Sequence, residues 1–205
     1  MITLAVDLFL PIYFTIIGVH YTATTLGLKQ RDGKTRIHYG ERGSKTWTIR
    51  WVFNSFRFAI LALMVARLLL PELDSLVLLK IEFAAEQAIR ALGALTMLVS
   101  FFMISYTHAY MASQWQSGVD TQSFKLLDKG PYRICRHPLF CAVILGMLGF
   151  ALALPSLFTL ICLAAGVWAL VRQAHEEERQ LLQQPEYRSY VQQTARWPLG
   201  LLQSR

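Results

Sequence analysis

The sequence predicts an all-α, polytopic membrane protein with about five transmembrane helices, a C-terminal helical hairpin and a short cytoplasmic amphipathic helix. Hydrophobic residues make up 54% of the 205 residues. They are concentrated in separate blocks, each close to the ~17 to 25 residues that a bilayer-spanning helix needs. The last two blocks lack the polar period of a soluble helix. The blocks are Thr3–Leu28, Trp51–Leu70, Ala84–Tyr106, Pro138–Leu154 and Ser156–Val171.

Charged residues between the blocks predict the topology. The net charge is +7, and the loop 29–50 is strongly basic, the loop 71–83 acidic and the segment 107–137 basic again. This alternation follows the positive-inside rule. It predicts an outside N-terminus, with the first loop, the third loop and the C-terminal tail in the cytoplasm. The basic excess then reflects topology and contact with anionic lipid headgroups, not binding of nucleic acid.

The first block is expected to be a retained helix, because no basic region precedes it as in a cleavable signal peptide. Four ionisable residues lie within the first two blocks. We expect Asp7 to reach water at the outer face, and Arg57 and Arg67 to extend toward the inner and outer faces. His20 should lie near the inner face, in a structural or a functional role.

The segment Gly130–Phe140 combines three cationic or potentially cationic side chains with two prolines. Pro131 and Pro138 fix φ and disfavour a helical residue before them. We therefore predict an ordered turn, with a helix that begins at Pro138. The turn places Arg136 and His137 at a membrane boundary beside a positive helix N-terminus, where an anionic ligand group is favoured.

Pro155 and Ser156 divide the long apolar stretch that follows into two helices, which predicts a tight hairpin. Both open ends of the hairpin then lie at the inner face. This arrangement brings the Arg136–His137 turn beside the segment Arg172–Arg179, which holds three successive glutamates. A short amphipathic helix and an interfacial Arg196-Trp197 pair should follow.

Several of these motifs, in this order, resemble the superfamily of isoprenylcysteine carboxyl methyltransferases and phospholipid methyltransferases. The resemblance covers about Gln114–Gly200, and the first three spans match only in number and polarity. It divides the chain into an N-terminal part, 1–113, and a catalytic region, 114–205. The motifs are Gly-Pro-Tyr-Arg-x-x-Arg-His-Pro-Leu-Phe from Gly130, Glu-Glu-Arg-x-Leu-Leu from Glu177, Glu-Tyr-Arg-x-Tyr from Glu186 and Arg-Trp-x-x-Gly from Arg196.

The resemblance implies an integral membrane enzyme that moves a methyl group from S-adenosylmethionine to a lipophilic acceptor, such as a prenylcysteine-like carboxylate or a lipid group. It implies that Arg172 and Glu177 are catalytic, with Arg172 facing the acceptor. Arg and a helix N-terminus suit the cofactor's carboxylate, and carboxylates suit its amine and ribose hydroxyls. The residues implied to bind the cofactor are Tyr132, Arg136, His137, Pro138, Leu139, Glu177 and Glu178.

Two residues depart from the family pattern. Phe140 stands where the family usually has Tyr, and Ala142 where it usually has Gly. A role that depends on the phenol hydroxyl is therefore in doubt.

Three other functions remain open: an NADPH-dependent sterol-type membrane reductase, a non-catalytic membrane scaffold, and a lipid-phosphate-binding module. The spacing of the three cysteines predicts neither a disulfide framework nor a metal site. The expected partners are the lipid bilayer and a lipophilic or prenylated substrate. The sequence selects neither the acceptor nor the oligomeric state.

Overall fold

The computed structural model describes residues 2–32, 42–81, 86–111 and 125–198. The elements of this part are helical, apart from one isolated antiparallel bridge between Lys80 and Ser156. In chain order they are α1 (Ile2–Asp32), α2 (Lys45–Leu69), the π-helix η1 (Asp74–Leu78), α3 (Glu86–Met111), the 3-10 helix η3 (Gly130–Arg133), α4 (Pro138–Ala153), α5 (Leu157–Leu181) and α6 (Pro185–Gln193). The predicted all-helical fold is confirmed.

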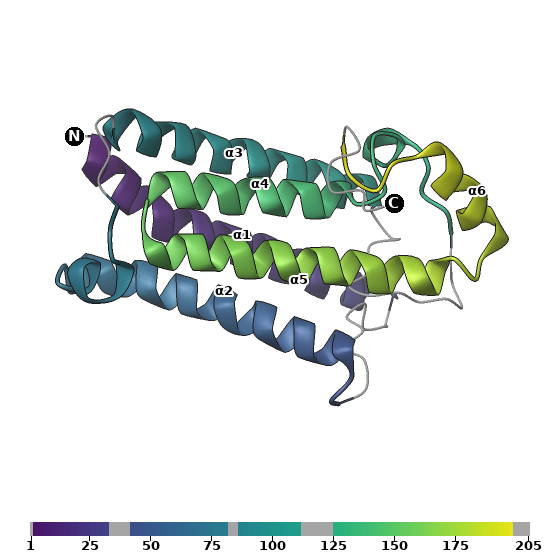
Figure 1. The fold of residues 1–205 in the computed structure, drawn as a ribbon, viewed down its shortest axis with the longest axis horizontal. Helices are drawn as coiled ribbons and strands as arrows, with labels where there is room; N and C mark the ends of the chain where they lie inside the picture. Colours follow the sequence, from purple (N-terminus) through teal and green to yellow (C-terminus); the bar gives the residue numbers. More distant parts are fainter. Residues whose placement is uncertain (1, 33–41, 82–85, 112–124, 199–205) are drawn as a thin grey trace.

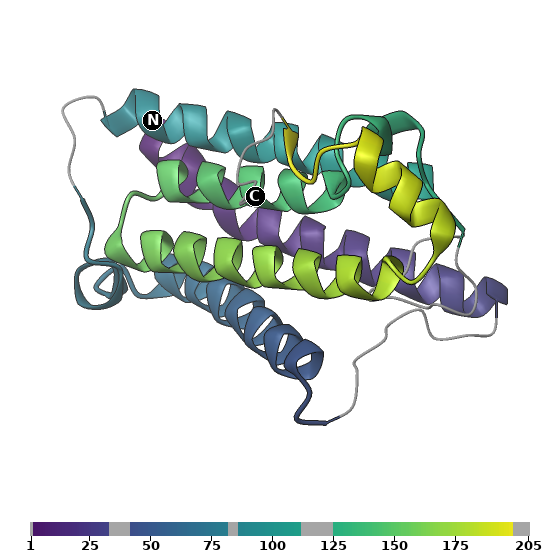
Figure 2. The same ribbon diagram turned by 45° about the vertical axis from the view of Figure 1, so that its right-hand side comes forward.

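The five long helices lie side by side along the longest axis of the molecule (Figures 1 and 2). One end of this bundle holds η3, α6 and the segment Thr194–Pro198, and we call it the tail end. The other end holds η1 and the tight turn between α4 and α5. Helices α1, α3 and α5 run toward the tail end, while α2 and α4 run away from it.

Within the described residues, three helices are long and apolar enough to cross a membrane: Ile2–Gln30, Glu86–Met111 and Leu157–Leu181. Helix α4 is also apolar but has 16 residues. Helix α2 lies beside α1 and α5 (Figure 1). These features identify a polytopic helical membrane protein.

The helix boundaries follow local signals in the sequence. Helix α4 begins at Pro138, as predicted, and the hairpin turn is closed by Ser156, whose hydroxyl accepts a hydrogen bond from the backbone N–H of Thr159 at 3.2 Å. Helix α2 begins at Lys45, six residues before the expected Trp51, because the Ser44 hydroxyl caps it by accepting from Trp47 N–H at 3.2 Å. Residues 33–41 of the basic loop 29–50, and the boundary between the two predicted regions, lie outside the described residues.

Small residues bring α3 and α4 into close contact. A Cβ atom added at Gly93 would lie 2.2 Å from the backbone nitrogen of Ala153, and one at Gly149 would lie 2.8 Å from that of Met97. Only a residue without a side chain allows this approach of two backbones in a membrane bundle. The contact fixes α4, and therefore the turn before it, against α3.

The end opposite the tail is closed by an ion network around two buried arginines, Arg67 and Arg90. Asp7 accepts hydrogen bonds from Arg67 at 3.2 Å and from Arg90 at 2.6 Å. Asp74 of η1 binds Arg67 and Lys80, and Arg90 also donates to the carbonyl oxygen of Ala153 at 3.0 Å. The expectation that Arg67 extends to the outer face was wrong, since Arg67 is 8% exposed and is bound to Asp7 and Asp74. Asp7 keeps 25% of its side chain exposed while it binds both arginines.

Asp74 belongs to this network but lies outside the membrane-spanning helices. Burial alone would raise the pKa of its carboxyl group, but the hydrogen bonds and charges of Arg67 and Lys80 outweigh burial and lower the pKa to about 2. The carboxylate therefore stays ionised throughout the physiological range.

Replacing Asp7 by Asn should destabilise the fold, because Arg67 and Arg90 lose a shared counter-charge in a buried position. Removing one partner of a buried ion pair costs about 3 kcal/mol. Thermal unfolding of the detergent-purified protein measures this loss. Glu72→Gln, at an exposed carboxylate near the same end, is the matched control; equal unfolding temperatures in the two variants would contradict the prediction.

Candidate active site

The turn before α4 is held in place from both sides. Gly130 has a φ of +57°, in the left-handed region that favours glycine, and a Cβ there would lie 2.5 Å from the ring of Tyr110 on α3. Pro131 is buried. The Tyr190 hydroxyl of α6 donates a 2.5 Å hydrogen bond to the carbonyl oxygen of Tyr132. The turn is therefore fixed between α3 and α6.

Arg136 and His137 connect this turn to the first residue of α4. The backbone N–H of Arg136 donates to the carbonyl oxygen of Ala195 at 2.9 Å, which brings the C-terminal segment across the turn. The His137 ring lies against Phe140 at 5.2 Å with 8° between the ring planes, and 5.9 Å from the ring of Trp197. His137 is thus enclosed between two aromatic rings and is only 7% exposed.

Glu178 is the centre of the polar contacts at the tail end. Its side chain is buried, with 3% of the residue exposed. Arg136 donates to Oε2 at 3.2 Å and His137 Nε2 lies 3.0 Å from Oε1. Arg196 donates to Oε1 at 3.0 Å through Nε and to Oε2 at 2.8 Å through a second nitrogen. We call Glu178 with these three partners the Glu178 cluster.

Glu177 is placed differently from its neighbour. It accepts a hydrogen bond from the Gln173 amide at 2.9 Å, one helical turn earlier on α5. One of its oxygens lies 3.9 Å from His137 Nδ1, and 20% of its side chain is exposed. Glu177 is therefore the more accessible of the two carboxylates, while Glu178 is enclosed by its cationic partners.

Several buried polar atoms around this cluster have no hydrogen-bond partner within the described part of the chain. They are Arg136 Nε, Gln173 Oε1 and Trp197 Nε1. Buried polar groups in native proteins are nearly always satisfied, so unpaired atoms that gather in one place indicate a missing binding partner. The three atoms comprise two donors and one acceptor.

The charges of the cluster shift neighbouring groups. The hydrogen bonds to Glu178 raise the pKa of Arg196. Burial, followed by the charge of Glu177, raises the pKa of Tyr132, and burial, followed by the charge of Glu178, raises that of Tyr187. Both phenols therefore stay protonated at physiological pH and act as neutral groups.

The structure brings together most of the predicted site residues. Arg136, His137, Glu177 and Glu178 lie in one group, with Tyr132 and Pro138 in the turn that carries them. Leu139 is half-buried in the first turn of α4. Arg172 is exposed on a different face of α5 from the buried Glu178, and so does not join the cluster.

Sequence reasoning missed three residues of the site. Gln173 lies four residues before Glu177, the spacing that allows contact on a helix. Arg196 and Trp197 were interpreted as an interfacial anchor, but Trp197 is 2% exposed and Arg196 is bound to Glu178. The signal that could have identified Arg196 and Trp197 as site residues was their position in the Arg-Trp-x-x-Gly motif.

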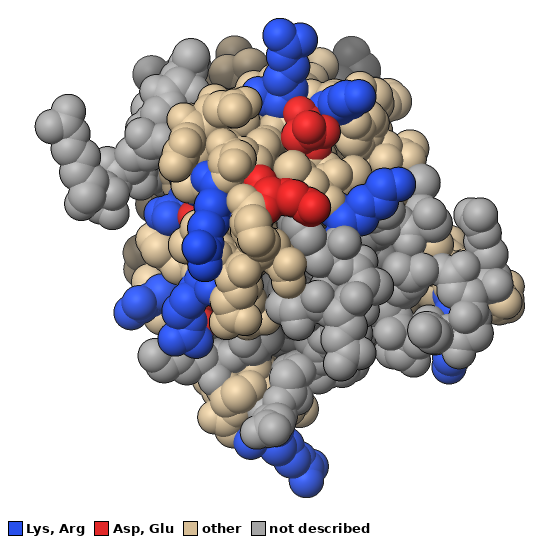
Figure 3. Space-filling view, turned by 90° about the vertical axis from the view of Figure 1, so that its right-hand side faces the viewer, with Lys and Arg blue, Asp and Glu red and all other residues tan. Residues whose placement is uncertain are grey.

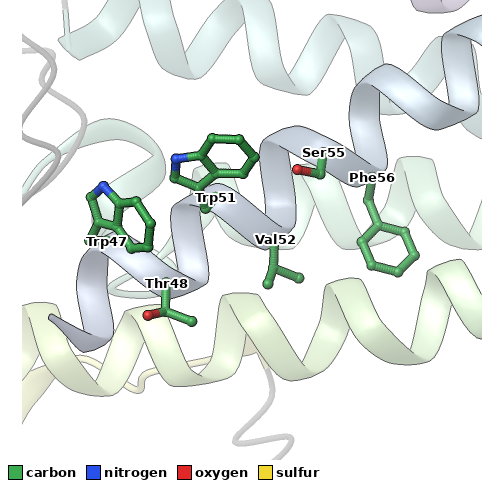
Figure 4. A pocket seen from close by; sticks show the side chains of 6 residues that line it. All are labelled: Trp47, Thr48, Trp51, Val52, Ser55 and Phe56. Carbon is green, nitrogen blue, oxygen red and sulfur yellow. The ribbon is translucent and has the colours of Figure 1, made fainter. Parts of the chain in front are cut away.

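The surface of the tail end carries many basic side chains, with acidic ones among them (Figure 3). Two hollows lie elsewhere. One, of about 290 Å³, is formed by side chains from successive turns of α2, including Trp47, Trp51 and Phe56 (Figure 4). The other, of about 210 Å³, lies beside Arg90 and Lys80 at the opposite end. No cluster of three or more metal-ligating side chains occurs among the described residues.

Comparison with known protein families identifies about half of the chain. Residues 88–185 match the family model described as phospholipid methyltransferase. This segment contains all of α3 except its first two residues, the whole of η3, α4 and α5, and both glutamates of the site. No curated protein and no solved structure matches the chain. The match favours methyl transfer over the reductase, scaffold and lipid-phosphate alternatives.

Replacing Glu178 by Gln should release the C-terminal segment from the turn, because Arg136 and Arg196 lose their shared counter-charge. Limited proteolysis at Arg196 measures the release, and cleavage should be faster than in the wild type. Glu186→Gln, an exposed carboxylate on α6, is the control and should leave cleavage unchanged. Equal cleavage of the Glu178 variant and the wild type would show that the cluster does not hold this segment.

Proposed function

Because the chain belongs, through residues 88–185, to the phospholipid methyltransferase family of the isoprenylcysteine and phospholipid membrane methyltransferase superfamily, we propose that it transfers a methyl group from S-adenosylmethionine to a lipophilic acceptor. The reaction takes place at the tail end of the bundle. The acceptor is a prenylcysteine-like carboxylate or a lipid group. By the positive-inside rule, the tail end faces the cytoplasm.

The three unpaired buried atoms beside the Glu178 cluster carry this proposal. S-adenosylmethionine has a carboxylate, an amine and ribose hydroxyls. The donors Arg136 Nε and Trp197 Nε1 suit the carboxylate, and the acceptor Gln173 Oε1 suits the amine. The donor and acceptor types at the site therefore fit the polar groups of this cofactor.

The two glutamates have separate roles in this proposal. Glu178 holds Arg136 and His137 of the turn and Arg196 of the tail in place, so it positions the binding groups. Glu177, whose side chain is 20% exposed and lies beside His137, contacts the cofactor's cationic amine or a hydroxyl. Bound S-adenosylmethionine supplies a methyl group on a positively charged sulfur. The chain supplies alignment and the exclusion of water around the reacting groups.

Arg172 is proposed to meet the polar end of the acceptor. It is exposed on α5 at the depth of Gln173 and Glu176, away from the residues that bind Glu178. An exposed guanidinium next to an apolar helix suits an acceptor that enters from the bilayer with its polar group leading. Acceptor affinity, rather than cofactor affinity, should then depend on Arg172.

Replacing Arg136 by Gln should weaken the binding of S-adenosylmethionine by about tenfold to a hundredfold. A hydrogen bond to a charged group contributes about 1.5 to 3 kcal/mol. Titration calorimetry on the detergent-purified protein measures this affinity. Arg133→Gln is a matched control, because Arg133 lies in the same turn but is exposed. The Arg133 variant should bind S-adenosylmethionine with the same affinity as the wild type.

Two results would contradict the proposal. Equal affinities in the Arg136 and Arg133 variants would place the cofactor elsewhere. The absence of binding to the wild-type protein would remove the methyltransferase function itself.

A further inference from the structure

Two histidines from different membrane helices form a pair away from the Glu178 cluster. His20 Nε2 of α1 lies 3.1 Å from His108 Nδ1 of α3, and the two ring planes differ by 10°. His108 is 8% exposed, while His20 is half-buried. Ionisable side chains inside membrane helices are costly and are retained mainly where they have a function.

The pair lies at the depth of the proposed reaction. Helices α3 and α4 are antiparallel, and Gly93 meets Ala153, Met97 meets Gly149 and Ser100 meets Gly146. When this pairing is continued toward the end of α3 and the start of α4, His108 of α3 lies opposite Pro138 of α4, the residue after His137. The histidine pair and the cationic turn therefore lie at the same level of the bundle.

A second buried polar group lies on the same face of α3. The Ser105 hydroxyl is buried and has no hydrogen-bond partner among the described residues. Ser105 precedes His108 by three residues, a spacing that places both on one side of a helix. Phe101 lies four residues before Ser105. Its ring packs edge-to-face with the His20 ring, with 5.8 Å between the ring centroids. This face of α3 thus carries the His108 imidazole and the Ser105 hydroxyl, and the His20 imidazole of α1 lies against it.

His137 is poorly suited to accept a proton from the acceptor. Its Nε2 is engaged with Glu178, and its Nδ1 lies toward Glu177. Two aromatic rings also enclose it. Glu178 is itself bound by two arginines. The acid–base groups of the cluster are therefore committed to holding the turn and the tail together.

We propose that the His20–His108 pair is the general base of the reaction and that the acceptor's reacting atom carries a proton, as in a lipid amine or thiol. This inference rests on the proposed function. The proton passes from the acceptor's nitrogen or sulfur to an imidazole nitrogen. The freed electron pair forms the bond to the methyl carbon, and the electron pair of the broken C–S bond stays on the donor's sulfur. The imidazolium then releases its proton to water through the half-exposed His20.

The test uses a long-chain primary amine, a long-chain thiol and the carboxylic acid of the same length as acceptors. We expect the wild type to methylate the amine or the thiol. A general base contributes about a hundredfold or more to the rate, so His108→Ala should lower kcat by about that factor. Added imidazole should restore part of this rate, and binding of S-adenosylmethionine should be unchanged by calorimetry.

Thr96→Ala is the control for changes in α3, because Thr96 is half-buried and its hydroxyl donates to the carbonyl oxygen of Leu92 in the same helix; it should leave kcat unchanged. A second test of the histidine pair does not need the cofactor. In ¹⁵N-histidine-labelled protein, the methylated acceptor alone should shift the ring nitrogen signals that His108→Ala and His20→Gln remove.

The inference is overturned by a kcat of His108→Ala equal to that of the wild type, by a loss that imidazole does not relieve, or by unshifted histidine signals. It is also overturned if the protein binds S-adenosylmethionine but methylates only the carboxylic acid, or none of the three probes. Failure to bind S-adenosylmethionine is a separate result, which contradicts the proposed function first.

Discussion

The Glu178 carboxylate connects two distant parts of the chain at the tail end of the bundle. Arg136 and His137 reach it from the turn before α4, and Arg196 reaches it from the segment after α6. A buried carboxylate is costly unless its charge is paired, so the three cationic partners and the carboxylate depend on one another. Together with the contacts that fix the turn between α3 and α6, this one group holds the C-terminal segment against the turn.

The two ends of the bundle use ion pairs for different purposes. At the end opposite the tail, Asp7, Arg67 and Arg90 join α1, α2 and α3, and Arg90 adds a contact to the end of α4. That network is bound together inside the protein and stabilises the fold. At the tail end, donors and an acceptor remain without partners within the described residues. The network at the end opposite the tail therefore holds helices together, whereas the cluster at the tail end also has donors and an acceptor that can bind a ligand.

Hydropathy and proline positions predicted the elements because the bilayer limits which segments can span it. Pro138 and the Pro155–Ser156 turn are local signals, and both helices of the hairpin begin where these signals indicate. The ordered motif predicted that the turn and the glutamates meet. It did not distinguish Glu177 from Glu178, because adjacent residues on a helix point in directions about 100° apart, and only packing decides which one is enclosed.

Two of the contacts that sequence reasoning missed are between residues far apart in the chain. Asp7 and Arg90 are 83 residues apart, and His20 and His108 are 88 residues apart. No local period relates them, so their pairing appears only when the helices are placed side by side. Arg67 was expected to reach the surface because a long side chain near a helix end can do so. Its ion pairs with Asp7 of α1 and Asp74 of η1 instead keep it inside.

Hydrogen–deuterium exchange of the protein in lipid nanodiscs, with and without S-adenosylmethionine, tests the central claim most directly. The cofactor should slow exchange together in the turn 130–137, in α5 around 173–178 and in the segment 194–197, because its binding groups come from all three. Protection confined to other parts of the chain, or unchanged exchange in these three segments while the cofactor is bound, would contradict a cofactor site built around Glu178.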